Sequence, residues 1–144
     1  MEYPGLYRSV REFQPGTKEQ VAGVGPLPEV APSVPIVDAM VEMDEQWETL
    51  MRLQKSHWAA PSNKHALLPA DEAALLREYF RELARTNEPA PRSADYRNLL
   101  AEPERLAEAL TRALRNPGPD HSMANGFMKE LAANCTACHK SFRN

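Results

Sequence analysis

The segment MANGFMKELAANCTACHKSFR, residues 123–143, has the pattern of an amphipathic helix. Its apolar residues recur every four or seven positions along one side, at Met123, Phe127, Leu131 and Cys138. Both cysteines of the chain, Cys135 and Cys138, lie in this segment, and His139 follows the second one directly. We therefore expect a last helix that carries the sequence Cys-Thr-Ala-Cys-His.

Three further helical segments precede it, and proline-marked breaks separate them. The clearest of them, residues 36–58, spaces its apolar side chains alternately by four and three, at Ile36, Met40, Met43, Trp47 and Leu50. We expect the others over residues 70–85 and 103–116, with one or two helical turns at 94–102. Pro103 suits the first position of its helix. No segment has the periodicity of a strand, so the sequence predicts an all-α fold, a four-helix bundle.

Residues 1–35 differ in composition from the rest of the 144-residue chain. They contain six of its 13 prolines and four of its six glycines, and they show no helical or alternating period. Proline fixes φ and has no N–H to donate, so we expect an extended, partly polyproline-like arm or linker. Residues 36–144 then form the folded domain.

Charge and hydropathy exclude two classes of function. The formal net charge of −3 and the pI near 5.8 do not fit a nucleic-acid-binding protein, which needs a basic patch. No apolar run approaches the ~20 residues of a membrane span. The first residues also lack the basic and apolar regions of a signal peptide.

The Cys-x-x-Cys-His sequence has four chemical interpretations. A thioredoxin-type dithiol needs a thiolate at a helix N-terminus, but this pair lies near a helix C-terminus, where the dipole disfavours a thiolate. A structural zinc ion needs four ligands, and the fourth would have to come from His121 or His65. A disulfide or two inert thiols would leave the adjacent histidine without a role.

The fourth interpretation is covalent haem attachment, for which Cys-x-x-Cys-His is the usual pattern. Two thioethers hold the two vinyl edges of one porphyrin, and the next residue brings its imidazole under the iron. The sequence favours one covalently bound haem c, with Cys135 and Cys138 as attachment sites and His139 as the proximal iron ligand. A bundle that encloses the macrocycle also gains apolar surface for a small core.

The segment CTACHKSFR resembles the C-terminal helix of cytochrome c-prime and of the low-spin cytochromes that share its fold. The pattern there is Cys-x-Ala-Cys-His-x-x-aromatic-Arg, and the chain matches it at Cys135, Ala137, Cys138, His139, Phe142 and Arg143. The similarity is specific over about the last twenty residues, architectural over 36–115, and absent over 1–35. It implies that Arg143 lies near a haem propionate or the proximal face.

The resemblance also implies that the first long helix lines the distal face of the haem. Low-spin members place a methionine sulfur over the iron, whereas high-spin members place an apolar residue there and bind small gases such as nitric oxide. Matching the spacing puts Met40 at that position, with Met43 and Trp47 along the haem; a shift of one turn makes Met43 the ligand. Phe127 of the last helix is expected to line the cofactor too. High-spin members often carry a basic residue one turn earlier, where this chain has Ile36.

We therefore expect a monohaem c-type cytochrome that transfers electrons through a low-spin His/Met-ligated haem and is not an enzyme. One alternative is a five-coordinate protein that binds nitric oxide. Another is a haem subunit of a larger electron-transfer complex, docked through residues 1–35. The resemblance implies a redox partner protein, a homodimer or complex subunit, and export to the periplasm, where haem c is attached; a signal peptide would then have been removed.

Overall fold

A computed structural model describes residues 15–23, 25–26, 35–62, 66–85, 94–116 and 120–142. These residues form helices and contain no strand, which confirms the all-α prediction. The helices are α2 (Lys18–Ala22), α3 (Ile36–Lys55), α4 (Pro69–Arg85), α5 (Ala94–Arg115) and α6 (Ser122–Phe142). None of the described helices is both long enough and apolar enough to cross a membrane.

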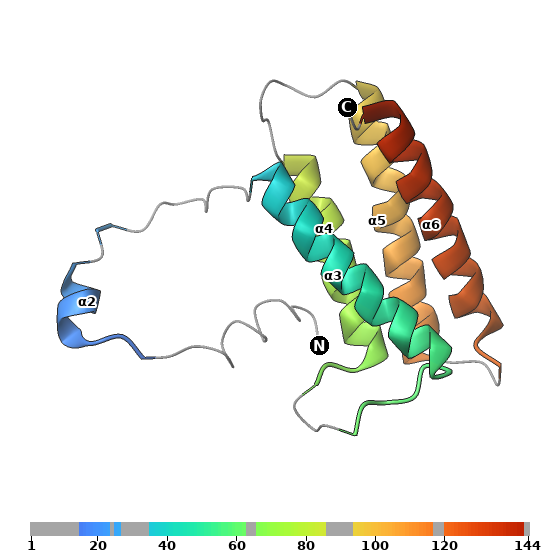
Figure 1. The fold of residues 1–144 in the computed structure, drawn as a ribbon, viewed down its shortest axis with the longest axis horizontal. Coiled ribbons are helices and arrows are strands. Elements are labelled where there is room, and N and C mark those ends of the chain that lie inside the picture. Colours follow the sequence, from blue (N-terminus) through green and yellow to red (C-terminus); the bar gives the residue numbers. More distant parts are fainter. Residues whose placement is uncertain are drawn as a thin grey trace.

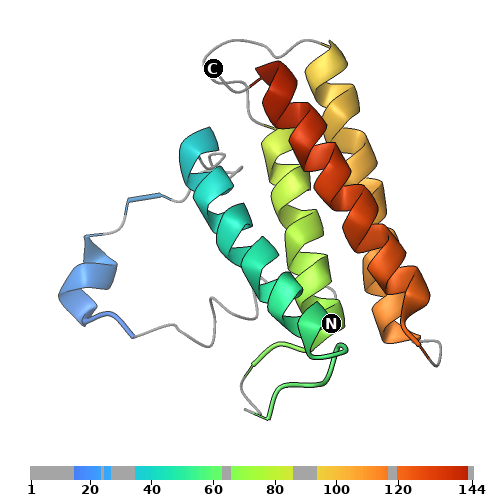
Figure 2. The same ribbon diagram turned by 45° about the vertical axis from the view of Figure 1, so that its right-hand side comes forward.

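The four long helices alternate in direction along the chain (Figure 1). α4 packs most closely against α5, α5 packs against α6, and α3 packs against α4. α3 and α6 approach each other less closely than any of these pairs. The first turn of α3 and the last turn of α6 lie at the same end of the assembly (Figures 1 and 2). The arrangement is a helical bundle with one less closely packed side.

The bundle interior is built mainly from leucines that all four long helices contribute. The largest side chains that are fully buried are Leu50, Leu76, Leu83, Leu106, Leu110, Leu131 and Thr111. Each buried leucine stabilises the fold by about 1.5–3 kcal/mol relative to an exposed one. The hydroxyl of Thr111 donates to the carbonyl of Ala107 at 2.8 Å, so its burial leaves no donor unpaired.

A buried polar contact fixes α3 on α4. Gln46 is only 3% exposed, and its Nε2 donates to the backbone oxygen of Glu72 at 2.8 Å and to Glu72 Oε2 at 2.7 Å. Nearer the solvent, the hydroxyl of Tyr79 donates to Glu42 Oε2 at 2.9 Å. A buried amide that uses both donors in this way specifies how the two helices pair.

Ion pairs on the surface join α4 to α5. Arg77 pairs with Glu108. Arg81, one turn later on α4, pairs at 2.9 Å with Glu104, one turn earlier on α5. Antiparallel helices bring side chains at matching turns together, so the two pairs follow from the same packing. Partly exposed pairs of this kind contribute about 1 kcal/mol or less each.

The prediction that Pro103 begins a helix is wrong, because α5 continues through it from Ala94 to Arg115. A proline inside a helix removes one backbone hydrogen bond and clashes with the preceding turn. Pro103 is itself buried, and the residues before and after it form one continuous buried stripe: Tyr96, Leu100, Leu106, Ala107 and Leu110. Burial of both halves of α5 offsets the cost of the proline.

The predicted extended arm is wrong at residues 18–22, which form the short helix α2. Thr17 and Gln20 make a reciprocal capping box: Thr17 N donates to Gln20 Oε1 at 2.8 Å, and Gln20 N donates to Thr17 Oγ1 at 3.3 Å. These bonds satisfy N–H groups that a helix start otherwise leaves open. Residues 1–14, 24 and 27–34 of the arm lie outside the described residues.

The first long helix ends at Lys55, three residues before its predicted end. His57 and Trp58 adopt positive φ angles of 54° and 60°, which cost L-residues roughly 1–2 kcal/mol each. This turn directs the Trp58 side chain into the bundle, where it is 6% exposed. Burial of the indole offsets the strained backbone.

Candidate functional site

The whole Cys-Thr-Ala-Cys-His sequence lies inside the last two turns of α6. Cys135 and Cys138 are both half-buried and have free thiols, while His139 is exposed. Positions 135, 138 and 139 are three and four residues apart, so their side chains leave the helix on the same side. Two free thiols and an imidazole therefore lie within one turn of one helix.

The electrostatics of the two thiols do not suit a redox dithiol. Burial raises the pKa of Cys135 above its ordinary value, and the neighbouring Cys138 and the Asp44 carboxylate raise that pKa further. Burial also raises the pKa of Cys138. Reactive cysteines of dithiol oxidoreductases have a lowered pKa, because the thiolate is the nucleophile. Both cysteines are held here as neutral thiols.

Hydrogen bonds to Asn125 define how α3 and α6 lie along each other. Gln54 Nε2 donates to Asn125 Oδ1 at 3.1 Å, and Trp58 Nε1 donates to the same oxygen at 3.1 Å. They join the end of α3 to the start of α6. The two helices run in opposite directions. Residues that are equally many positions from this contact, toward the other end of the bundle, therefore lie at the same height along the bundle axis, which we call the same level.

This register brings Met40 and His139 to the same level. Met40 precedes Gln54 by 14 residues and His139 follows Asn125 by 14 residues, which is about 21 Å along each helix. Fourteen residues are also nearly four complete helical turns. Met40 therefore lies on nearly the same side of α3 as Gln54, and His139 on nearly the same side of α6 as Asn125, so both lie on the sides where these helices face each other.

On the side of each helix that faces the other, residues recur every seven positions. On α3 the sequence is Met40, Trp47 and Gln54, and on α6 it is Asn125, Ala132 and His139. Met40 and Trp47, the two members of the α3 series toward the cysteine end, are half-buried, and both pack against the hydrophobic core. Ala132, at the level of Trp47, is small and exposed. Small or exposed residues on α6 thus face large apolar residues on α3.

Two other predicted cofactor-lining residues, Met43 and Phe127, belong to the core. Met43 is 9% exposed and lies in the buried cluster, one turn nearer the middle of α3 than Met40. Phe127 is half-buried and packs on the same cluster, two turns before Cys135 on α6. Neither lies at the level of His139.

An aromatic contact fixes the end of α6 on α5. The rings of Tyr96 and Phe142 meet edge to face, with centroids 5.3 Å apart and an interplanar angle of 81°. Phe142 belongs to the quoted C-terminal pattern, but nothing in the sequence indicates its partner. Arg143, which is expected near a haem propionate or the proximal face, lies outside the described residues.

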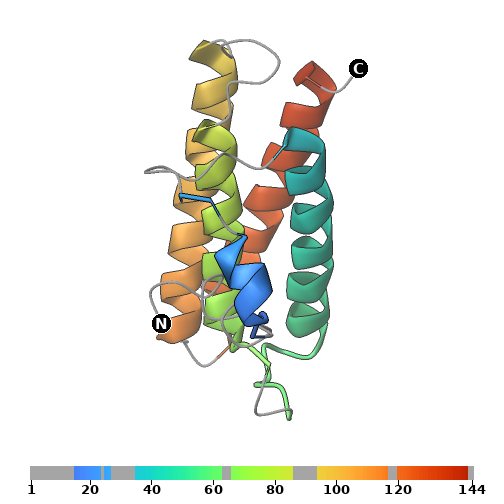
Figure 3. The ribbon, with the colours of Figure 1, turned by 90° about the vertical axis from the view of Figure 1, so that its left-hand side faces the viewer.

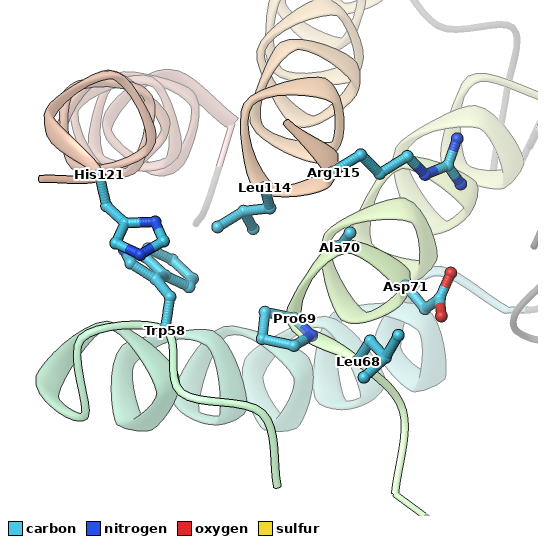
Figure 4. A pocket seen from close by; sticks show the side chains of 8 residues that line it. All are labelled: Trp58, Leu68, Pro69, Ala70, Asp71, Leu114, Arg115 and His121. Atoms are coloured by element: carbon cyan, nitrogen blue, oxygen red, sulfur yellow. The ribbon is translucent and has the colours of Figure 1, made fainter. Parts of the chain in front are cut away.

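A cavity of about 460 Å³ lies at the opposite end of the bundle, far from the cysteines. Figure 4 shows His121 and Trp58 on one side of it and Leu114, Pro69 and Ala70 on the other, while the charged ends of Arg115 and Asp71 point away from His121. His121 precedes His139 by 18 residues, or about 27 Å along α6. It is too distant to share a metal ion with the two cysteines.

Among the described residues, His57 adds no ligand to the cysteine pair. His57 is exposed in the turn after α3, and His65 lies outside the described residues. Within the described ranges, no group of three or more His, Cys, Asp or Glu side chains is arranged to hold a metal ion. The zinc interpretation therefore has no further ligand to draw on in the part of the chain that is described.

Comparison with known proteins adds no relative to these observations. The chain matches no protein-family model, and neither the curated proteins nor the solved structures give a match.

Proposed function

We propose that the chain is a monohaem c-type cytochrome, in which Cys135 and Cys138 hold one haem c and His139 is the proximal iron ligand. The observation that carries the proposal is the position of these residues. They occupy one turn of α6, at the end of the bundle remote from the Gln54–Asn125 contact, and α6 packs less closely on α3 than on α5. A redox role follows because, when bound, the haem supplies a one-electron ferric/ferrous couple.

The chemistry of the donors fits the group. Haem c needs two free thiols about one helical turn apart and an imidazole next to the second, and the chain supplies all three from one regular helix. His139 is exposed, so its nitrogen is not used inside the protein core. Cys135 packs against the hydrophobic cluster and Cys138 is half-buried, so an apolar macrocycle can replace solvent beside them.

Each side chain has a distinct role in this proposal. Cys135 and Cys138 would hold the group on α6, and His139 would supply a nitrogen to its iron. Met40 and Trp47, both half-buried on α3, exclude water from the other side. Dry, apolar surroundings favour the less charged ferrous state and raise the reduction potential.

We assign the distal iron ligand to Met40 rather than Met43. Met40 lies at the level of His139 on the facing side of α3 and remains half-buried. Met43 is more deeply buried and already packs in the core cluster. With Met40 as a second ligand besides His139, a bound haem would leave no open position for a gas, which suits electron transfer better than gas binding.

The same proposal extends to the architecture and the location of the protein. Residues 36–144 form a four-helix bundle whose α3–α6 side is completed by the haem, and residues 1–35 are an arm that docks it to a redox partner or complex. Because haem c is attached outside the cytoplasmic membrane in bacteria, we place the protein in the periplasm.

The test is production of the chain, exported by an added signal peptide, together with a cytochrome c maturation system. We expect one haem per chain that acidified acetone does not extract, and an intact mass increased by one haem. The double variant Cys135→Ala, Cys138→Ala should lose the covalent haem, whereas the matched variant Met123→Ala, on the same helix, should keep it. Recovery of the wild-type chain without covalent haem would refute the proposal.

A further inference from the structure

The solvent-facing side of α3 combines two exposed valines with a group of acidic residues. Val37 is 69% exposed and Val41 is 57% exposed, and both are among the few large apolar side chains with such exposure in the described residues. The neighbours of Val41 at helical spacings of three, four and seven are acidic and exposed: Asp38, Asp44, Glu45 and Glu48. We call these six residues the outer face of α3. It has an apolar centre and an acidic rim.

The charge of α3 up to Met51, before the basic Arg52 and Lys55 of its last turn, is unusual for the chain. Residues 36–51 contain five acidic residues and no Lys or Arg, a formal charge of −5, while the whole chain carries −3. The rest of the chain therefore carries a formal charge of +2. Within the described ranges, the four acids of the outer face take part in no ion pair. Their charge is available to an incoming partner.

The outer face borders the proposed haem site. Val41 follows Met40 directly, and Asp44 and Cys135 are each ten residues from the Gln54–Asn125 contact, which puts them at the same level. α3 stands at one edge of the bundle, with α4 between it and α5 (Figures 2 and 3). A protein seated on this face would thus lie next to the cysteines of α6 at the less closely packed side of the bundle.

We propose that the outer face of α3 is the docking surface for a basic redox protein, whose own contact surface has an apolar centre and a rim of Lys or Arg. This inference rests on the proposed function. Interfaces between soluble partners commonly have an apolar core and a polar rim, which is the arrangement of Val37 and Val41 among four carboxylates. Complementary charge steers the encounter, and the apolar contact then holds the pair in position for electron transfer.

The first test maps binding without electron transfer. The probe is a mitochondrial-type cytochrome c in its ferrous state, a basic protein with lysines around its haem edge, titrated into the isotopically labelled, reduced holoprotein at low salt. We expect amide shifts to concentrate at residues 37–48 and to vanish as salt is raised above ~0.2 M. Shifts spread over the surface, or centred elsewhere, would overturn the inference.

The second test uses matched variants and the rate of electron transfer to the ferric form of that probe. Glu45→Gln, Glu48→Gln should lower the second-order rate constant roughly fivefold to tenfold, and Glu82→Gln, Glu130→Gln, with the same change in charge, should alter it less than about twofold. Equal effects of the two pairs, or none, would contradict the docking surface.

The apolar centre has its own control. Val37 and Met123 are both 69% exposed, but Met123 lies at the other end of the bundle. We expect Val37→Ser to raise the dissociation constant about threefold, with no change for Met123→Ser. Concentration-dependent self-association that Val41→Ser abolishes would show that a second copy occupies the face, and would overturn the inference. The amide-shift map tests only where the partner binds. Absence of covalent haem would instead refute the proposed function.

Discussion

Gln54 near the end of α3 donates a hydrogen bond to Asn125 near the start of α6, and this contact fixes the register of the two helices. Trp58 donates to the same oxygen, so one amide holds two donors from the end of α3. Everything proposed for the opposite end of the bundle depends on this register. It brings Met40 level with His139 and Asp44 level with Cys135.

Asn125→Ala should lower the free energy of unfolding by about 1–3 kcal/mol. The change removes the acceptor of both bonds and leaves the partly buried Trp58 Nε1 without its partner. Urea denaturation followed by tryptophan fluorescence measures the effect. The exposed Asn116→Ala, at the end of α5, should change stability by less than about 0.5 kcal/mol. An Asn125 variant as stable as wild type would remove the basis of the register.

Gln46→Ala should be more damaging than Gln54→Ala. Gln46 is buried and donates twice to Glu72, once to the carboxylate, so its loss should cost about 2–4 kcal/mol. Gln54 is only half-buried and makes one bond. Chemical denaturation of both variants gives the comparison, and equal losses of stability would show that the buried contact does not fix α3 on α4.

Glu108 should make stability depend on pH in the acid range. A hydrogen bond from Arg77 lowers the pKa of Glu108 below the ordinary 4.5 despite some desolvation, and the positive charges of Arg77, Arg112 and Arg115 lower it further. Because the folded-state pKa is the lower one, this stabilisation is complete above pH 4.5 and is lost as the pH falls through the folded-state value.

We therefore expect Glu108→Gln to be less stable than wild type at pH 7, by about 1 kcal/mol or less because the pair is partly exposed, and the gap to narrow as the pH falls below 4.5. Denaturation curves between pH 3 and 7 measure this convergence. A constant gap between Glu108→Gln and wild type at all pH values would disprove the linkage.

Much of the fold follows from the sequence, because amphipathic periods over long segments are dominated by burial. The periodic residues of α3 and α4 are buried or half-buried as expected. On α6 the prediction is wrong at Met123, which is 69% exposed, and the buried residues there are Ala124, Met128 and Leu131. α5 differs because the cost of a proline inside a helix is local, whereas the buried stripe on both sides of Pro103 acts over the whole helix. α2 could have been found from Thr17 and Gln20, whose spacing is that of a capping box.

Part of the candidate site could also be identified from the sequence, and part could not. Cys135, Cys138 and His139 could be identified from the chain alone, because their relation is local and lies within one helical turn. The level of Met40 relative to His139 could not, since it depends on a contact between Gln54 and Asn125, 71 residues apart in the chain. The positive φ angles that direct Trp58 to that contact also have no sequence signal, because any L-residue disfavours them.

The central claim, a haem held between His139 and Met40, is tested most directly by the ferric absorption spectrum of the holoprotein. We predict a low-spin spectrum with the weak far-red band of methionine sulfur on iron. Met40→Leu should convert it to a high-spin spectrum, whereas Met43→Leu should keep the band and cost less than about 1.5 kcal/mol of stability. A high-spin wild-type spectrum, or loss of the band in Met43→Leu alone, would contradict the account.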